Sequence, residues 1–144
     1  MTQSVEKLNA LLSSYHVFYV NVRGYHWNVK GEHFFSLHAK FEELYTELQT
    51  QIDEIAERIL TLGGSPLHAY SDFATLSGIK EHKNVFDGRE CVQGVVTGLE
   101  ALIGEQKALA EVAEAAGDQG TVDLVSGYTS EQEKQVWMYK AFLG

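Results

Sequence analysis

The sequence predicts an all-α protein, built as a four-helix bundle with one long crossover connection. Apolar residues recur every three or four positions along most of the chain, which is the period of an amphipathic helix. The chain also holds a single proline, Pro66, so long helices can run without interruption. A length of 144 residues is typical of one domain, and we expect residues 1–144 to form one.

The first half of the chain predicts two long helices joined by a tight turn. The first is expected from about Ser4 to Val29, with Gly31 at the position of a left-handed C-terminal cap. The second is expected from about Phe34 to Leu62, because Gly63-Gly64 and Pro66 follow it. Their apolar stripes comprise Val5, Leu8, Leu12, Tyr15, Phe18, Tyr19 and Val22 in the first helix, and Leu37, Phe41, Leu44, Leu48, Ile52, Ile55, Ile59 and Leu62 in the second.

The middle of the chain, from Gly64 to Phe86, carries only a weak helical signal. We therefore expect a long crossover there, with a short helix at Asp72–Leu76. A crossover of this length allows the second and third long helices to run parallel.

Two further long helices are predicted in the second half. Asp87 followed by Glu90 resembles a capping box that starts the third helix, which continues to about Gly117. The fourth is expected from about Thr121 to Leu143. Four long helices with one long crossover have the connectivity of ferritin-like proteins.

Composition and charge exclude several classes of protein. An apolar content of 44% argues against disorder, and the unbroken apolar run Val17–Val20 is far too short to span a bilayer. The N-terminus lacks the pattern of an export signal, so a cytoplasmic location is expected. A net charge of -9, from 11 basic and 20 acidic residues, opposes nucleic acid and anionic membranes and suits the handling of cations. The single cysteine, Cys91, is expected in the core, so any metal must use His, Asp and Glu.

Three local groups carry candidate metal ligands: His26, the pair His38 and Glu42, and the pair Asp53 and Glu57. Each pair is four residues apart and so lies on one helix face. Solvated surface pairs are an alternative interpretation, because such spacings are common on exposed faces. The two histidines flank one tight turn, however, where their imidazoles can converge.

Imidazole nitrogen together with carboxylate oxygen suits iron, manganese or zinc better than calcium or magnesium. Neutral imidazoles bind Fe(II) without adding charge, and two carboxylates offset the charge that grows in Fe(III). The same ligands can therefore hold both oxidation states of iron.

Geometry restricts how such a site can be built. His38 and Asp53 are 15 residues apart on one predicted helix, which is about 22 Å along its axis. If both groups bind one metal, Asp53 and Glu57 must come from a second chain, packed antiparallel across a two-fold axis. A centre inside one bundle would need Glu-x-x-His pairs, and no histidine has a glutamate three residues before it.

These residues stand in an order that resembles the Dps family, the mini-ferritins or DNA-binding proteins from starved cells. The resemblance covers almost the whole chain. It is carried by His26–Gly31, Phe34, Leu37-His38, Phe41, Asp53–Ile59, Leu62–Pro66 and the closing segment Trp137–Leu143.

The resemblance implies a hollow homododecamer with ferroxidase sites at its two-fold interfaces. His26 and His38 of one subunit would face Asp53 and Glu57 of its neighbour, with Glu42 as an additional carboxylate. The family oxidises Fe(II), usually with hydrogen peroxide, and stores the ferric mineral, which protects against oxidative damage. Zinc matches the same ligands and is expected to compete.

Other residues carry two interpretations each. Trp27 can quench oxidising equivalents or pack at an interface. Glu43 and Glu47 can face the cavity or only solvent. Asp118 and Asp123 resemble acidic residues of the family's three-fold pores, or they complement a helix dipole. The remaining histidines, His16, His33, His68 and His82, are expected to be ordinary surface or core residues.

Two alternative functions remain at this point, a nucleoid-associated DNA-binding protective protein and a purely structural shell. The shell conflicts with four intact ligand positions. DNA binding is not expected, because Lys7 is the only basic residue before Arg23 and Lys140 stands alone near the C-terminus.

Overall fold

Five α-helices make up the fold in the computed structural model, which describes residues 2–144. They are α1 (Thr2–Asn28), α2 (Phe34–Thr61), α3 (Tyr70–Leu76), α4 (Gly88–Ala115) and α5 (Gln119–Leu143). The four long helices and the short helix of the crossover match the predicted elements, with ends that differ by at most two residues. None of the helices in this part of the chain combines the length and apolar character that crossing a membrane requires.

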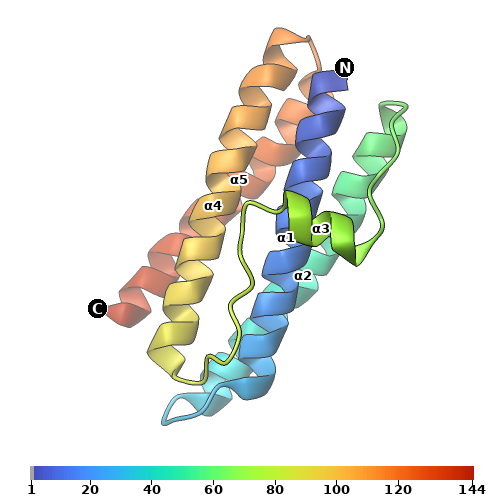
Figure 1. Cartoon of the computed structure of the whole chain (residues 1–144). Helices are drawn as coiled ribbons and strands as arrows, with labels where there is room; N and C mark the ends of the chain where they lie inside the picture. The colour runs from blue at the N-terminus through green and yellow to red at the C-terminus, as the bar shows by residue number, and fades with distance from the viewer. Residues whose placement is uncertain (1) are drawn as a thin grey trace.

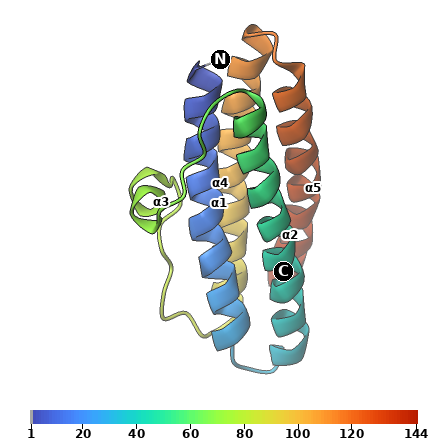
Figure 2. The ribbon, with the colours of Figure 1, turned by 90° about the vertical axis from the view of Figure 1, so that its right-hand side faces the viewer.

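The long helices form two antiparallel pairs, α1 with α2 and α4 with α5, and α1 also packs against α4 (Figure 1). The crossover runs down the outside of the bundle, so α2 and α4 are parallel as predicted (Figure 2). The short helix α3 lies against the outer side of α1. This connectivity places the α1–α2 turn beside the start of α4, where Lys30 forms a bridge with Asp87.

Local chemistry explains where the helices end. Gly63 and Gly117 take φ angles of 85° and 73°, which favour glycine, directly after α2 and α4. Asp87 accepts a hydrogen bond from the Glu90 backbone at 3.1 Å, so the predicted cap of α4 is confirmed. α5 begins two residues earlier than predicted because Asp118 caps it.

The core is mainly aliphatic and aromatic, and Cys91 is fully buried in it, as predicted. One polar layer crosses this core. Tyr15 donates to the side-chain oxygen of Gln106 and accepts from Gln132 at 2.9 Å. Gln106 in turn donates to Gln132 at 3.0 Å. The side chains of Tyr15, Gln106 and Gln132 are partners of one another. The layer therefore fixes α1, α4 and α5 in one register at little desolvation cost.

Ring stacking and hydrogen bonds fasten the crossover to α1 at several places. The ring of His16 stacks on Phe73 of α3, with centroids 3.9 Å apart. Further along, the amide of Asn21 donates to the backbone oxygen of Lys80 and accepts from the backbone nitrogen of His82, both at 3.0 Å. The backbone of the loop after α3 is therefore held by hydrogen bonds with the Asn21 side chain as well as by packing.

Candidate metal centre

Two histidines converge at the α1–α2 turn. His26 lies in the last turn of α1 and His38 in the second turn of α2, and their rings stack with centroids 3.8 Å apart. Each Nδ1 is hydrogen-bonded to the other residue's backbone oxygen, at 2.6 Å for His26 and 2.7 Å for His38. A carbonyl oxygen only accepts, so both Nδ1 atoms carry the hydrogen. In the neutral imidazoles both Nε2 atoms then keep their lone pairs for a ligand.

The surroundings of the two rings are apolar on one side and acidic on the other. Tyr45 meets His26 edge-on at 5.3 Å, and Phe34 stacks on His38 at 5.0 Å. His26 is buried, and its Nε2 lies 3.7 Å from an oxygen of the exposed Glu42. The structure thus brings the rings of His26 and His38 together and places the carboxylate of Glu42 beside His26.

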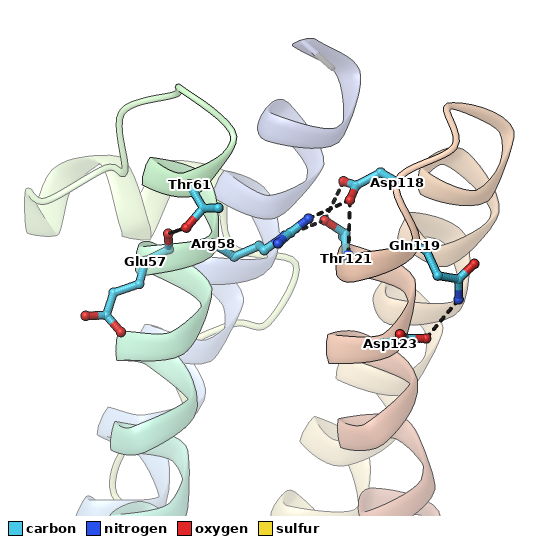
Figure 3. A network of polar contacts seen from close by, with 7 residues as sticks. All are labelled: Glu57, Arg58, Thr61, Asp118, Gln119, Thr121 and Asp123. Carbon is cyan, nitrogen blue, oxygen red and sulfur yellow. Dashed lines mark hydrogen bonds and ion pairs between the residues drawn. The ribbon is translucent and has the colours of Figure 1, made fainter.

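Asp53 and Glu57 do not join this group within one chain. Both are exposed on α2, one helical turn apart, and Asp53 lies about 22 Å along the helix axis from His38. Within residues 2–144, no three His, Cys, Asp or Glu side chains are placed to hold a metal ion. The carboxylate of Glu57 points away from α5, on the opposite side of α2 from its neighbour Arg58 (Figure 3).

Arg58 belongs to a polar network that the sequence analysis missed. Its Nη2 donates to Asp118 at 2.6 Å and its Nε donates to the Thr121 hydroxyl at 3.0 Å (Figure 3). Gly120 makes room for it, since a Cβ there would lie 2.6 Å from the guanidinium. Arg58 is 60 residues from Asp118 in sequence, and no local pattern marks that pair.

Asp118 acts as the helix cap, which is one of its two interpretations. Its carboxylate accepts from the backbone nitrogen of Thr121 at 3.2 Å. Burial alone would raise the pKa of Asp118, but hydrogen bonds from Thr121 and Arg58 outweigh it and hold that pKa below its ordinary value. Asp123 is exposed and accepts from Gln119 at 2.8 Å. A pore role stays a prediction for both aspartates.

Glu43 and Glu47 differ in their surroundings. Glu43 is exposed, 3.9 Å from Lys40. Glu47 is half-buried and accepts from Gln51 at 3.2 Å and from Gln135 at 3.0 Å. Burial raises the pKa of Glu47 above its ordinary value, against the effect of these hydrogen bonds. That either one nucleates mineral stays a prediction.

Two tyrosines carry further contacts without a sequence signal. Tyr128 donates to Glu54 at 2.6 Å, which links α5 to the helix turn of Asp53. The Tyr25 hydroxyl lies 2.5 Å from Nδ1 of His82, a residue that the sequence analysis took as ordinary. Trp27, for which the sequence leaves quenching of oxidising equivalents and packing at an interface open, is 62% exposed.

Residues 5–144 match the family of ferritin-like domains. The chain is 42% identical over 138 residues to the DNA protection during starvation protein of Porphyromonas gingivalis, covering 96% of this chain and 87% of that protein.

Solved structures agree with this match. The Dps protein of Vibrio cholerae O1, described as a member of a broad superfamily of ferritin-like diiron-carboxylate proteins, superposes with a TM-score of 0.98 and 51% identity, covering 99% of this chain and 90% of that one. Dps from Listeria innocua soaked with zinc gives a TM-score of 0.94 and 35% identity, covering 98% and 96%.

Proposed function

The chain belongs to the Dps family of ferritin-like proteins, and on that premise we propose that it oxidises Fe(II) and stores the ferric product. The observation that carries this proposal is the reciprocal pair of hydrogen bonds between each imidazole Nδ1 of His26 and His38 and the other residue's backbone oxygen. Histidines that bind metals commonly donate their second ring nitrogen to a carbonyl or carboxylate, which fixes both tautomer and ring direction. Here both imidazoles are oriented in this way by the other residue's backbone oxygen.

The second half of the site is assigned to a neighbouring subunit. Asp53 and Glu57 are exposed, and within residues 2–144 no third His, Cys, Asp or Glu is placed to hold a metal ion with them. An antiparallel pairing of two α2 helices across a two-fold axis would set them opposite the histidines of the partner. The complete set is then two imidazoles and two carboxylates, with Glu42 beside them.

Iron is the substrate of this site, and hydrogen peroxide is the proposed oxidant. Two Fe(II), one peroxide and two waters give two FeOOH and four protons, so both electrons that peroxide accepts come from iron. Oxidation in the presence of carboxylates is favoured because they offset the rising charge of the metal. Removing free Fe(II) and peroxide together would protect the cell from hydroxyl radicals, and we place this activity in the cytoplasm.

The storage compartment is proposed to be a homododecamer. Its subunits each carry a net charge of -9, which would draw Fe(II) toward the shell by electrostatic focusing. Sedimentation at micromolar protein should give a shell-sized particle, and a species of 16.1 kDa would contradict the assembly.

Anaerobic titration with Fe(II), followed by peroxide, tests the proposed activity through ferric absorbance. His26→Ala and His38→Ala should each remove most of the oxidation while the helical circular dichroism spectrum persists. His33→Ala is the matched control, because His33 is an exposed histidine of the same turn. Zinc added first should slow the parent protein. Parent-like rates in both site variants would show that iron is oxidised elsewhere.

A further inference from the structure

A buried tyrosine, one residue before the proposed iron ligand His26, is hydrogen-bonded to a histidine of the crossover. Tyr25 directly precedes His26, so their Cα atoms are about 3.8 Å apart. Tyr25 is 2% exposed, and its hydroxyl lies 2.5 Å from Nδ1 of His82. The rings meet edge-on, with centroids 5.6 Å apart. When the imidazole of His82 is neutral with its hydrogen on Nε2, Nδ1 accepts and the phenol of Tyr25 donates.

Two residues, Asn21 and Gly94, determine where this pair lies. Asn21 on α1 fixes the crossover through its hydrogen bonds to the backbones of Lys80 and His82. On α4, Gly94 leaves the space that the pair occupies, because a Cβ there would lie 2.2 Å from the Tyr25 oxygen and 2.9 Å from the His82 nitrogen. His82 itself is exposed, so a proton taken up by its ring can pass to solvent.

Two other oxidisable side chains lie beside His26. Tyr45 meets its ring edge-on at 5.3 Å, and Trp27 follows it in the sequence. The surroundings of Trp27 are less suited to losing an electron than those of Tyr25. The guanidinium of Arg23 lies over the Trp27 ring, 4.8 Å from the centroid. A cation is attracted to the electron-rich face of an aromatic ring. Removing an electron from that ring would replace the attraction with repulsion between two positive charges. Tyr25 avoids this cost, because its proton leaves with the electron and the product is neutral.

We propose that Tyr25 and His82 form a proton-coupled electron donor for the iron site, used when only one Fe(II) is present to meet a peroxide. This inference rests on the proposed function. One Fe(II), one hydrogen peroxide and the Tyr25 phenol give one Fe(III), two hydroxide ions, a neutral tyrosyl radical and one proton on Nδ1 of His82. Fe(II) and Tyr25 each supply one electron, and together they reduce the O–O bond of peroxide to two hydroxide ions. No hydroxyl radical is therefore released. The oxidising equivalent is kept on a buried ring.

Freeze-quenched electron paramagnetic resonance tests this assignment. Anaerobic protein receives one Fe(II) per proposed site and then peroxide, with ring-deuterated tyrosine incorporated to identify the radical. The parent should give a tyrosyl signal that narrows on deuteration. Tyr25→Phe should lose the signal, and His82→Gln, which can accept the hydrogen bond but not the proton, should lower its yield several-fold. Gly94→Ala, which displaces the pair, should act like His82→Gln.

Tyr70→Phe is the matched control, because Tyr70 is an exposed tyrosine on α3 and should leave the signal unchanged. A tyrosyl signal of parental size in Tyr25→Phe would overturn the proposal. A tryptophanyl signal in the parent that disappears in Trp27→Phe would overturn it as well, and would assign the electron to Trp27.

Ferric absorbance of the parent, read from the same samples, separates this proposal from the proposed function. If the parent forms no Fe(III), the proposed function has failed, and the pair is then tested on iron-free protein with a photogenerated one-electron oxidant. A radical that is lost in Tyr25→Phe and reduced in His82→Gln would still support the donor pair. Equal radical yields in these variants and the parent would overturn it.

Discussion

The guanidinium of Arg58 on α2 lies 2.6 Å from the carboxylate of Asp118, the residue that caps α5 (Figure 3). The ion pair joins the end of one helix to the beginning of another, 60 residues later in the chain. It also fixes the helix turn that carries Glu57, whose carboxylate points the other way. One face of this turn thus packs within the chain, and the opposite face, which carries Glu57, is exposed.

Replacing Asp118 should separate its two roles. Asp118→Ala removes both the cap and the ion pair, and we expect it to lower the free energy of unfolding by about 2 kcal/mol. Asp118→Asn keeps a side chain that caps equally well, so its loss of about 1 kcal/mol reports mainly on the pair with Arg58. Urea unfolding at one chain concentration measures both. Equal losses for the two variants would mean that the cap contributes nothing.

The difference in the free energy of unfolding between the parent and Asp118→Asn should depend on pH. Because the pKa of Asp118 is held below its ordinary value in the folded state, its charge stabilises the protein above the unfolded pKa, which is about 4. That stabilisation is lost as the pH falls through the lower, folded pKa. The difference between the parent and Asp118→Asn should therefore be full at neutral pH and shrink below about pH 4. A difference that stays constant in acid would contradict an ionised Asp118 in the native state.

The sequence predicts the fold well because the information lies in neighbouring residues. Helix periodicity, the cap at Asp87 and the glycines after α2 and α4 are all local signals, and each matches the structure. The start of α5 was placed two residues late, although Asp118 stands three residues before Thr121 as a cap would.

The site was predictable only in part. His26 and His38 converge because one tight turn brings them together, and spacing alone indicates this. The contacts of Arg58 with Asp118 and of Tyr25 with His82 join residues that are 60 and 57 positions apart. Such pairs follow from the packing of whole helices, which no local motif encodes. Whether Asp53 and Glu57 complete the site stays a prediction.

Asp123 offers a test of ion entry. If it lines an acidic pore, Asp123→Asn should slow Fe(II) uptake, most clearly at low ionic strength, because salt screens exposed charges. Stopped-flow iron oxidation at low and high salt measures the effect. Asp72→Asn, an exposed aspartate on α3, is the control for a general loss of negative charge. Equal rates in Asp123→Asn and the control would leave Asp123 as a surface residue of α5.

DNA binding is expected to be weak at neutral pH. Affinity for duplex DNA comes largely from Lys and Arg contacts to phosphates, and this chain has 11 such residues against 20 Asp and Glu. A gel-shift assay with plasmid, at about pH 7.5 with chelator, should show free DNA at moderate salt. The chelator removes bridging by divalent cations. Retention of plasmid that weakens as salt rises would instead support a nucleoid-associated role.

The proposed iron site takes His26 and His38 from one subunit and Asp53 and Glu57 from another. Two double variants test it, one lacking both histidines and one lacking both carboxylates, each replaced by Ala. Alone, neither should oxidise Fe(II) with peroxide at more than a small fraction of the parental rate.

Co-assembly of the two double variants in equal amounts is the decisive measurement. In a two-fold dimer of unlike chains, one of the two sites recovers all of its ligands and the other loses them all. Random pairing should then restore about a quarter of the parental rate of Fe(II) oxidation, because half of the dimers are mixed. Mixing the two proteins without unfolding and reassembly is the control and should restore nothing. A co-assembled shell of correct size that remains inactive would contradict a site shared between subunits.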